Sequence, residues 1–164
     1  MINKHSYTGK TYEEAVNKAK IDLQELEENL IINTKEEKKT LLSKKIEIEV
    51  IEKREVKEYL KKVIKSLLKD MGFDVEIEIT VNNDTPTYRL YSTNDALLIG
   101  KDGKNLKALT TVVNAILTKG INTNYRFLID VSDYKEKNDR RIERLAKKLA
   151  REVKATRVEV KMDS

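Results

Sequence analysis

Apolar positions follow two different spacings along the chain, and these spacings predict where helices and strands alternate. Over residues 11–26 the apolar side chains recur at the spacing of an amphipathic helix. Thr11, with Glu14 three residues later, is typical of a capping box at the start of that helix. Strands are predicted at residues 5–10, 30–32 and 46–50, and a loop at the charged residues 33–40. Residues 1–52 are therefore expected to fold as a small β-α-β-β module.

Glu47 and Glu49 alternate with apolar residues in the third of these strands and so share one of its faces. Two carboxylates on one face are compatible with acid catalysis, but no histidine, cysteine or second carboxylate cluster accompanies them. A solvated outer face is therefore the favoured interpretation.

Residues 53–132 are expected to form a second unit with a different order of elements. Apolar residues at helical spacing predict a helix over residues 56–71, which Gly72 should close as its C′ residue. The expected elements that follow are strands at 75–81 and 88–91, a short helix at 95–99 capped by Thr93 or Asn94, a long helix at 104–119 and a strand at 125–131.

Two of the five glycines lie three residues apart between the short and the long helix, as Gly100-Lys101-Asp102-Gly103. Glycine permits a positive φ and the close approach of another backbone, and the free N–H groups at the start of the next helix attract anions. Lys101 can reach a phosphate oxygen, whereas Asp102 would repel one and is expected to point away. The alternative is a tight turn that needs glycine only for its backbone shape.

Residues 133–164 predict a long basic helix, capped by Ser132 or Asp133, and then a strand at 157–160. The helix has an apolar stripe formed by Ile142, Leu145, Leu149 and Val153. The cations that are candidates for binding are Arg140, Arg144, Lys148 and Arg151. Such residues either pair with nearby glutamates on a solvated face or contact nucleic-acid phosphates.

Charge is distributed unevenly, which favours a polyanionic partner for the later part of the chain. The formal charge of +5 is made up of −2 over residues 1–52, +3 over 53–132 and +4 over 133–164. The absence of cysteine excludes disulfides and thiolate metal sites, and no apolar run is long enough to predict a membrane span. No nucleophile–base pair, metal-ligand spacing or Walker-type loop is visible, so neither catalysis nor a cofactor or metal is expected. The expected location is the cytoplasm.

The element order of residues 53–132, with Gly-x-x-Gly between its helices, closely resembles the type II KH domain, a three-stranded sheet with helices on one face. In KH domains this turn clamps the backbone of about four single-stranded nucleotides. The resemblance implies that phosphates are held by Gly100, Lys101, Asp102 and Gly103. It also implies a groove wall and added positive potential from Leu98, Ile99, Lys104 and Lys107. Either Leu98 or Ile99 must belong to the core, because they point apart on a helix.

Two further stretches resemble one bacterial family, the Jag or SpoIIIJ-associated proteins. Thr-Gly-Lys-Thr-Tyr-Glu-Glu-Ala at residues 8–15 is similar to the start of the Jag N-terminal module, and Arg-Leu-Ala-x-x-Leu-Ala at 144–150 to the opening of an R-three-H domain. The Jag pattern places a Gly-rich turn near residues 38–42, where this chain has no glycine. The chain is thus identified as an α+β member with a Jag module at 1–52, a KH domain at 53–132 and a partial R-three-H domain at 133–164.

Membership of the Jag family implies a cytoplasmic, non-enzymatic protein that binds single-stranded RNA and regulates it in cell elongation or envelope synthesis. It implies a second, smaller KH-domain protein as a partner. Single-stranded DNA stays open as a ligand, as does the oligomeric state. The alternative function is a protein scaffold, in which the acidic N-terminal module recruits a partner and nucleic acid is secondary.

Overall fold

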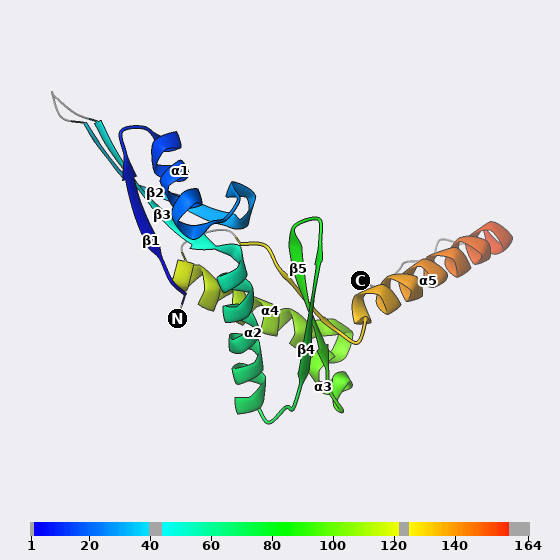
Figure 1. Cartoon of the computed structure of the whole chain (residues 1–164). Helices are drawn as coiled ribbons and strands as arrows, with labels where there is room; N and C mark the ends of the chain where they lie inside the picture. Colours follow the sequence, from blue (N-terminus) through cyan, green and yellow to red (C-terminus); the bar gives the residue numbers. More distant parts are fainter. Residues whose placement is uncertain (1, 40–43, 122–124, 158–164) are drawn as a thin grey trace.

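The computed structural model describes residues 2–39, 44–121 and 125–157, and within them two three-stranded sheets are each accompanied by helices (Figure 1). The first sheet has the order β1-β3-β2 and the second the order β4-β5-β6. The elements are β1 (His5–Gly9), α1 (Tyr12–Leu23), η1 (Glu27–Asn29), β2 (Leu30–Lys39), β3 (Lys44–Glu52), α2 (Lys53–Asp70), β4 (Glu76–Asn82), β5 (Thr85–Tyr91), α3 (Asp95–Ile99), η2 (Lys101–Gly103), α4 (Lys104–Ile121), β6 (Leu128–Val131) and α5 (Tyr134–Thr156). The predicted α+β fold class is confirmed.

The first sheet is antiparallel and carries α1 on one face, with Ala15, Val16 and Ala19 buried in a small core against β3. One prediction for this region was wrong, because residues 33–39 form no loop. They continue β2, which pairs with β3 as far as Lys39 opposite Lys44, with a register shift between Thr34 and Glu36. Strand pairing depends on the backbone groups that β3 presents, so a long partner strand can override the loop-like composition of this segment.

The prediction of a solvated face was wrong for Glu49, which is buried. Its residue is only 8% exposed, and its carboxylate lies 3.2 Å from Lys4 Nζ and 3.1 Å from Lys35 Nζ. Burial raises the pKa of Glu49, but hydrogen bonds from the two ammonium groups outweigh that effect and hold it below its ordinary value. A carboxylate that stays ionised in this way is an ion-pair partner and is poorly suited to act as a general acid.

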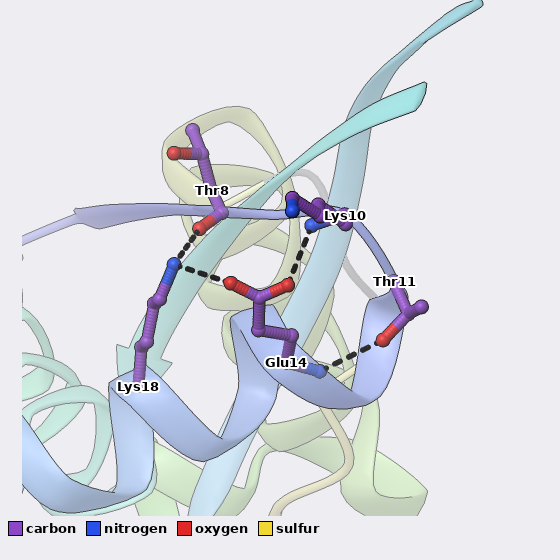
Figure 2. Close-up of polar contacts among 5 residues, drawn as sticks. All are labelled: Thr8, Lys10, Thr11, Glu14 and Lys18. Atoms are coloured by element: carbon purple, nitrogen blue, oxygen red, sulfur yellow. Dashed lines mark hydrogen bonds and ion pairs between the residues drawn. The ribbon is translucent and has the colours of Figure 1, made fainter. Parts of the chain in front are cut away.

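The Thr-Gly-Lys-Thr run forms a polar clamp that fastens the end of β1 to the start of α1 (Figure 2). Glu14 N donates to Thr11 Oγ1 at 3.2 Å, so the predicted N-cap is confirmed. The reciprocal bond differs from a standard capping box, because Glu14 Oε2 accepts from Lys10 N at 2.9 Å. Lys18 Nζ completes the clamp by donating to Glu14 Oε1 at 2.8 Å and to Thr8 O at 2.9 Å.

Gly9 has a steric role in the same clamp. A Cβ atom at Gly9 would lie 2.7 Å from Ala15 N and 2.8 Å from Thr11 O, closer than side-chain carbons approach backbone atoms. The glycine therefore lets β1 pass directly over the start of α1, where Thr11 and Glu14 serve as capping groups. These contacts give Gly9-Lys10-Thr11 a structural role.

The second sheet packs one face against α2 and α4, and this packing forms the main core of the protein. Tyr88 and Leu90 of β5 and Ile129 and Val131 of β6 are fully buried on that face. β4 is antiparallel to β5, while β5 and β6 are parallel, and parallel strands need a crossover, which α3 and α4 supply here. The predicted order of helices and strands is confirmed, and α2 ends just before Gly72 as expected.

The two sheets are joined without a linker, because β3 ends at Glu52 and α2 begins at Lys53. Ile51, the penultimate residue of β3, is fully buried in the core of the second sheet, and Ile31 of β2 packs against the same core. The end of the first sheet thus lies directly against the second unit.

Helix α5 leaves β6 and projects away from both sheets (Figure 1). Its stripe residues Ile142, Leu145 and Val153 are 42%, 46% and 37% exposed. Asp133 occupies the N-cap position, as one of the two predicted candidates, with a φ of 58° and without a side-chain capping bond. Of the predicted strand at 157–160, Arg157 is the C-cap of α5 and the rest lies outside the described residues. No helix in the described ranges is both long and apolar enough to cross a membrane.

Candidate nucleic-acid interface

The loop between α3 and α4 has a backbone shape that its glycines make possible. Gly100 has φ 70° and ψ 177°, Asp102 has φ 53°, and Gly103 has φ 76°. A positive φ combined with ψ near 180° is populated by glycine alone. These left-handed residues reverse the chain between two helices within four positions.

Asn105 braces the loop from the first turn of α4. Its Nδ2 donates to Leu97 O at 2.8 Å and so satisfies a carbonyl near the end of α3. A Cβ atom at Gly100 would lie 2.6 Å from Asn105 Cγ, so the bare α-carbon at 100 is what allows this contact. Sequence reasoning missed Asn105; the available signal was an amide side chain two residues after Gly-x-x-Gly.

Tyr134 places an aromatic ring beside the other glycine. A Cβ atom at Gly103 would lie 3.1 Å from Tyr134 Cε1 and 3.3 Å from its hydroxyl oxygen. Tyr134 is half-buried at the start of α5, where Lys135 N donates to Asp130 Oδ1 at 3.3 Å. The Ser132 hydroxyl donates to Asp95 Oδ2 at the start of α3. These bonds fix the ring against a loop far earlier in the chain, so no local sequence pattern predicted it.

Around this backbone the cationic side chains are accessible. Lys101, Asp102, Lys104 and Lys107 are all exposed. In the described part of the chain, no ion pair involves any of these three lysines. The loop and the first turn of α4 therefore present unneutralised positive charge next to the N-terminal N–H groups of the helix.

The apolar pair before the loop divides as expected between core and surface. Leu98 is 4% exposed and belongs to the main core, whereas Ile99 is half-buried and packs against that core from outside. The preceding residue, Leu97, is 62% exposed.

Along α4, a cleft of about 550 Å³ lies between this helix and the beginning of the edge strand β6. Apolar surface makes up the larger share of its lining, but hydroxyl, amide and guanidinium groups also line it, and we call it the polar cleft. Its lining includes Thr110, Thr111, Asn114, Arg126 and Leu128. Lys107 precedes Thr111 by one helical turn and so lies on the same side of α4 as the cleft. The cleft therefore continues the cationic surface that begins at the glycine loop.

A second, apolar cleft of about 250 Å³ lies on the other side of α4, between that helix, α2 and α3. It is lined by Leu67, Met71, Phe73, Leu97, Leu98, Asn105, Ala108, Leu109 and Val112. Leu98 thus reaches a cleft beside the loop as the KH resemblance implied, while Ile99 lines neither of the two clefts.

The candidate cations of α5 are not brought to the loop. Arg140, Arg144, Lys148 and Arg151 are all exposed on the projecting helix, and Arg151 lies about 25 Å along it from Tyr134. Arg140 pairs with Glu136, and Lys148 Nζ lies 3.9 Å from Glu152 Oε1. Half of this predicted set is therefore engaged in ion pairs within the helix.

In residues 2–39, 44–121 and 125–157, acidic and imidazole groups do not gather into a metal site. Among the described residues, no group of three or more His, Cys, Asp or Glu side chains could hold a metal ion.

Comparison with known proteins places this geometry in a family. Residues 57–129 match the family described as KhpA/KhpB, KH domain, which confirms the predicted KH fold. The chain is 27% identical over 165 residues to RNA-binding protein KhpB of Clostridium symbiosum, covering 95% of this chain and 73% of that protein. It is 31% identical over 98 residues to RNA-binding protein KhpB of Lactiplantibacillus plantarum, covering 60% of this chain and 30% of that protein. The KH unit at residues 57–129 thus belongs to the KhpA/KhpB family, and the chain is similar to KhpB proteins over most of its length.

Proposed function

We propose that this protein binds single-stranded RNA, with backbone phosphates at residues 100–104 and bases in the polar cleft between α4 and β6. The observation that carries the proposal is a set of exposed, unpaired lysines at the glycine loop and the first turn of α4, the helix whose following turns line a cleft of about 550 Å³. The name of both relatives, RNA-binding protein KhpB, supports RNA as the ligand.

Electrostatics at the loop favour an anion. Residues 101–107 carry three lysines and one aspartate, and the positive end of the α4 dipole lies at the same place. Gly100 and Gly103 give the loop its turn through their positive φ, and Lys101 between them is exposed, so a sugar-phosphate chain can approach its ammonium group. The loop recognises the backbone of the strand and is indifferent to its base sequence.

The polar cleft suits bases better than the apolar one. Unpaired bases expose hydrogen-bonding edges, and burying such groups without partners costs free energy. Thr110, Thr111 and Asn114 offer donors and acceptors along one wall, and Arg126 offers a planar cation on the other. The apolar cleft contributes Asn105 as its polar side chain.

Adjacent positions on α4 distinguish the two clefts. Thr111 lines the polar cleft and Val112 the apolar cleft, and both are exposed. Thr111→Glu is expected to weaken RNA binding about tenfold or more, because it blocks the cleft and repels phosphates, whereas Val112→Glu should change it less than about threefold. Both variants add the same charge to the same helix, so each controls for the other in a fluorescence anisotropy titration with labelled single-stranded RNA. A larger loss in Val112→Glu would assign the bases to the apolar cleft.

The resemblance to the Jag family also bears on the cellular role and the domain division of the protein. We propose a cytoplasmic, non-enzymatic regulator of RNA linked to cell elongation or envelope synthesis, paired with a smaller KH-domain protein. The pattern at residues 144–150 supports residues 133–164 as the beginning of an R-three-H domain, next to units at 1–52 and 53–132.

A further inference from the structure

The polar cleft along α4 does not end at β6. Its far end is formed by Thr85, Tyr125 and Arg126, and the same three residues line a second cavity of about 300 Å³. That cavity is completed by Ile31 of β2, by Lys53 at the start of α2 and by the turn between β4 and β5. The two cavities are thus parts of one depression that runs from the KH unit onto the end of the first sheet.

Side chains in this junction are suited to an unpaired nucleotide. Tyr125 is half-buried and lines both cavities, so its ring is held at the surface between them. The Tyr125 phenol is neutral near pH 7, as any tyrosine is, and burial and the nearby Asp84 carboxylate raise its pKa further, to about 12. A fixed neutral ring is a surface on which bases of any identity can stack.

The cavity of about 300 Å³ is lined by two cationic side chains, Lys53 and Arg126, and by one acidic side chain, Asp84. Arg126 is exposed, and no ion pair to it occurs in the described ranges. Lys53 Nζ lies 2.5 Å from Asp84 Oδ2, and this aspartate is the acidic side chain of the cavity. The pair neutralises Asp84, which leaves Arg126 to attract a phosphate.

The length of α4 explains why a strand would reach this junction. From Lys104 to Asn114 the helix rises about 15 Å, and a strand that follows it from the glycine loop passes along the polar cleft toward the junction. A KH groove holds about four nucleotides. A longer strand that leaves the groove in this direction therefore arrives at Tyr125.

We infer that a single-stranded RNA held by the glycine loop continues into a second subsite at the junction of the two sheets, an inference that rests on the proposed function. In this subsite Tyr125 stacks on a further base and Arg126 contacts its phosphates, while Lys53 neutralises the Asp84 carboxylate beside them. The first sheet then forms part of the RNA-binding surface through Ile31, and the protein recognises strands longer than one KH groove holds.

The experiment compares four-nucleotide and eight-nucleotide uridine oligonucleotides on the full chain by fluorescence anisotropy. Lys53 and Asp84 line the junction but not the polar cleft, so Lys53→Glu and Asp84→Asn change the junction without replacing a side chain of the polar cleft. An eightmer offers about five positions to a four-nucleotide site, which alone would raise its affinity roughly fivefold. With a second subsite, the eightmer should bind more than about tenfold tighter than the fourmer. Lys53→Glu should weaken eightmer binding about fivefold and Asp84→Asn should strengthen it about twofold, with fourmer affinity unchanged in both. Lys62→Glu, on an exposed lysine of α2 outside these cavities, controls for net charge.

An eightmer advantage of about fivefold or less, together with unchanged eightmer binding in both junction variants, would overturn the second subsite while leaving the KH groove intact. A fourmer that fails to bind the parent protein would instead contradict the proposed function itself. Circular dichroism melts of each variant confirm that affinity is compared between folded proteins.

Discussion

Lys101→Asp is expected to lower the affinity for single-stranded RNA about 100-fold. The substitution removes a charge-assisted contact worth about 1.5–3 kcal/mol, and it places a second carboxylate beside Asp102 in the loop that meets the phosphates. Because Lys101 is exposed and forms no ion pair within the described residues, the free energy of unfolding should change by less than about 0.5 kcal/mol. Fluorescence anisotropy measures the affinity, and a urea titration followed by circular dichroism measures the stability.

Lys62→Asp is the matched control, since Lys62 is an exposed lysine of α2 that lines neither the two clefts beside α4 nor the junction cavity. It should weaken binding less than about threefold. The slope of log affinity against log salt should become shallower by about 0.7 in Lys101→Asp, as one phosphate contact is lost. If Lys101→Asp and the parent protein bound RNA with equal affinity, the loop would not be part of the binding site.

Gly100→Ala has the largest expected effect on stability, a loss of about 2–4 kcal/mol in the free energy of unfolding. Alanine strongly disfavours φ 70° with ψ 177°, and its Cβ would lie 2.6 Å from Asn105 Cγ. The side chain of Asn105 must then move and give up its bond to Leu97 O. Urea denaturation of the two proteins measures the difference.

Gly120→Ala provides the comparison at a glycine with the opposite environment. Gly120 lies within α4 without a positive φ, and a Cβ atom there would meet no atom within 4 Å. Alanine is the better helix former, so this variant should gain about 0.5–1 kcal/mol. If Gly100→Ala unfolded at the same urea concentration as the parent, the left-handed conformation of Gly100 and its close contact with Asn105 would be contradicted.

Most of the fold was predictable because its signals are local. Alternating apolar residues marked β3 and β4, helical spacing marked α2 and α4, and Thr11 with Glu14 marked the start of α1. The loop at 100–103 stood out because glycine is rare in this chain and two occur three residues apart. In each case the sequence pattern and the physical cause lie within a few residues of each other.

The features that escaped prediction depend on contacts between distant segments. The extension of β2 to Lys39 requires the long partner strand β3, and the burial of Glu49 requires ammonium groups from Lys4 and Lys35. The Tyr134 ring lies beside Gly103, about thirty residues earlier in the chain. Tyr125 is a candidate for binding only because it lines a cavity formed by both units. The sequence indicates which side chains are able to bind a ligand. The packing of separate helices and strands decides which of those side chains lie on one surface.

Nuclear magnetic resonance tests RNA binding at the glycine loop most directly, through a titration of the ¹⁵N-labelled full chain with an eight-nucleotide single-stranded RNA. The largest amide shifts are expected on residues 100–107 and 110–114 and on residues 126–128. Shifts confined to α5 or to the first sheet, with the amides of residues 100–103 unmoved at saturating RNA, would contradict binding at this loop.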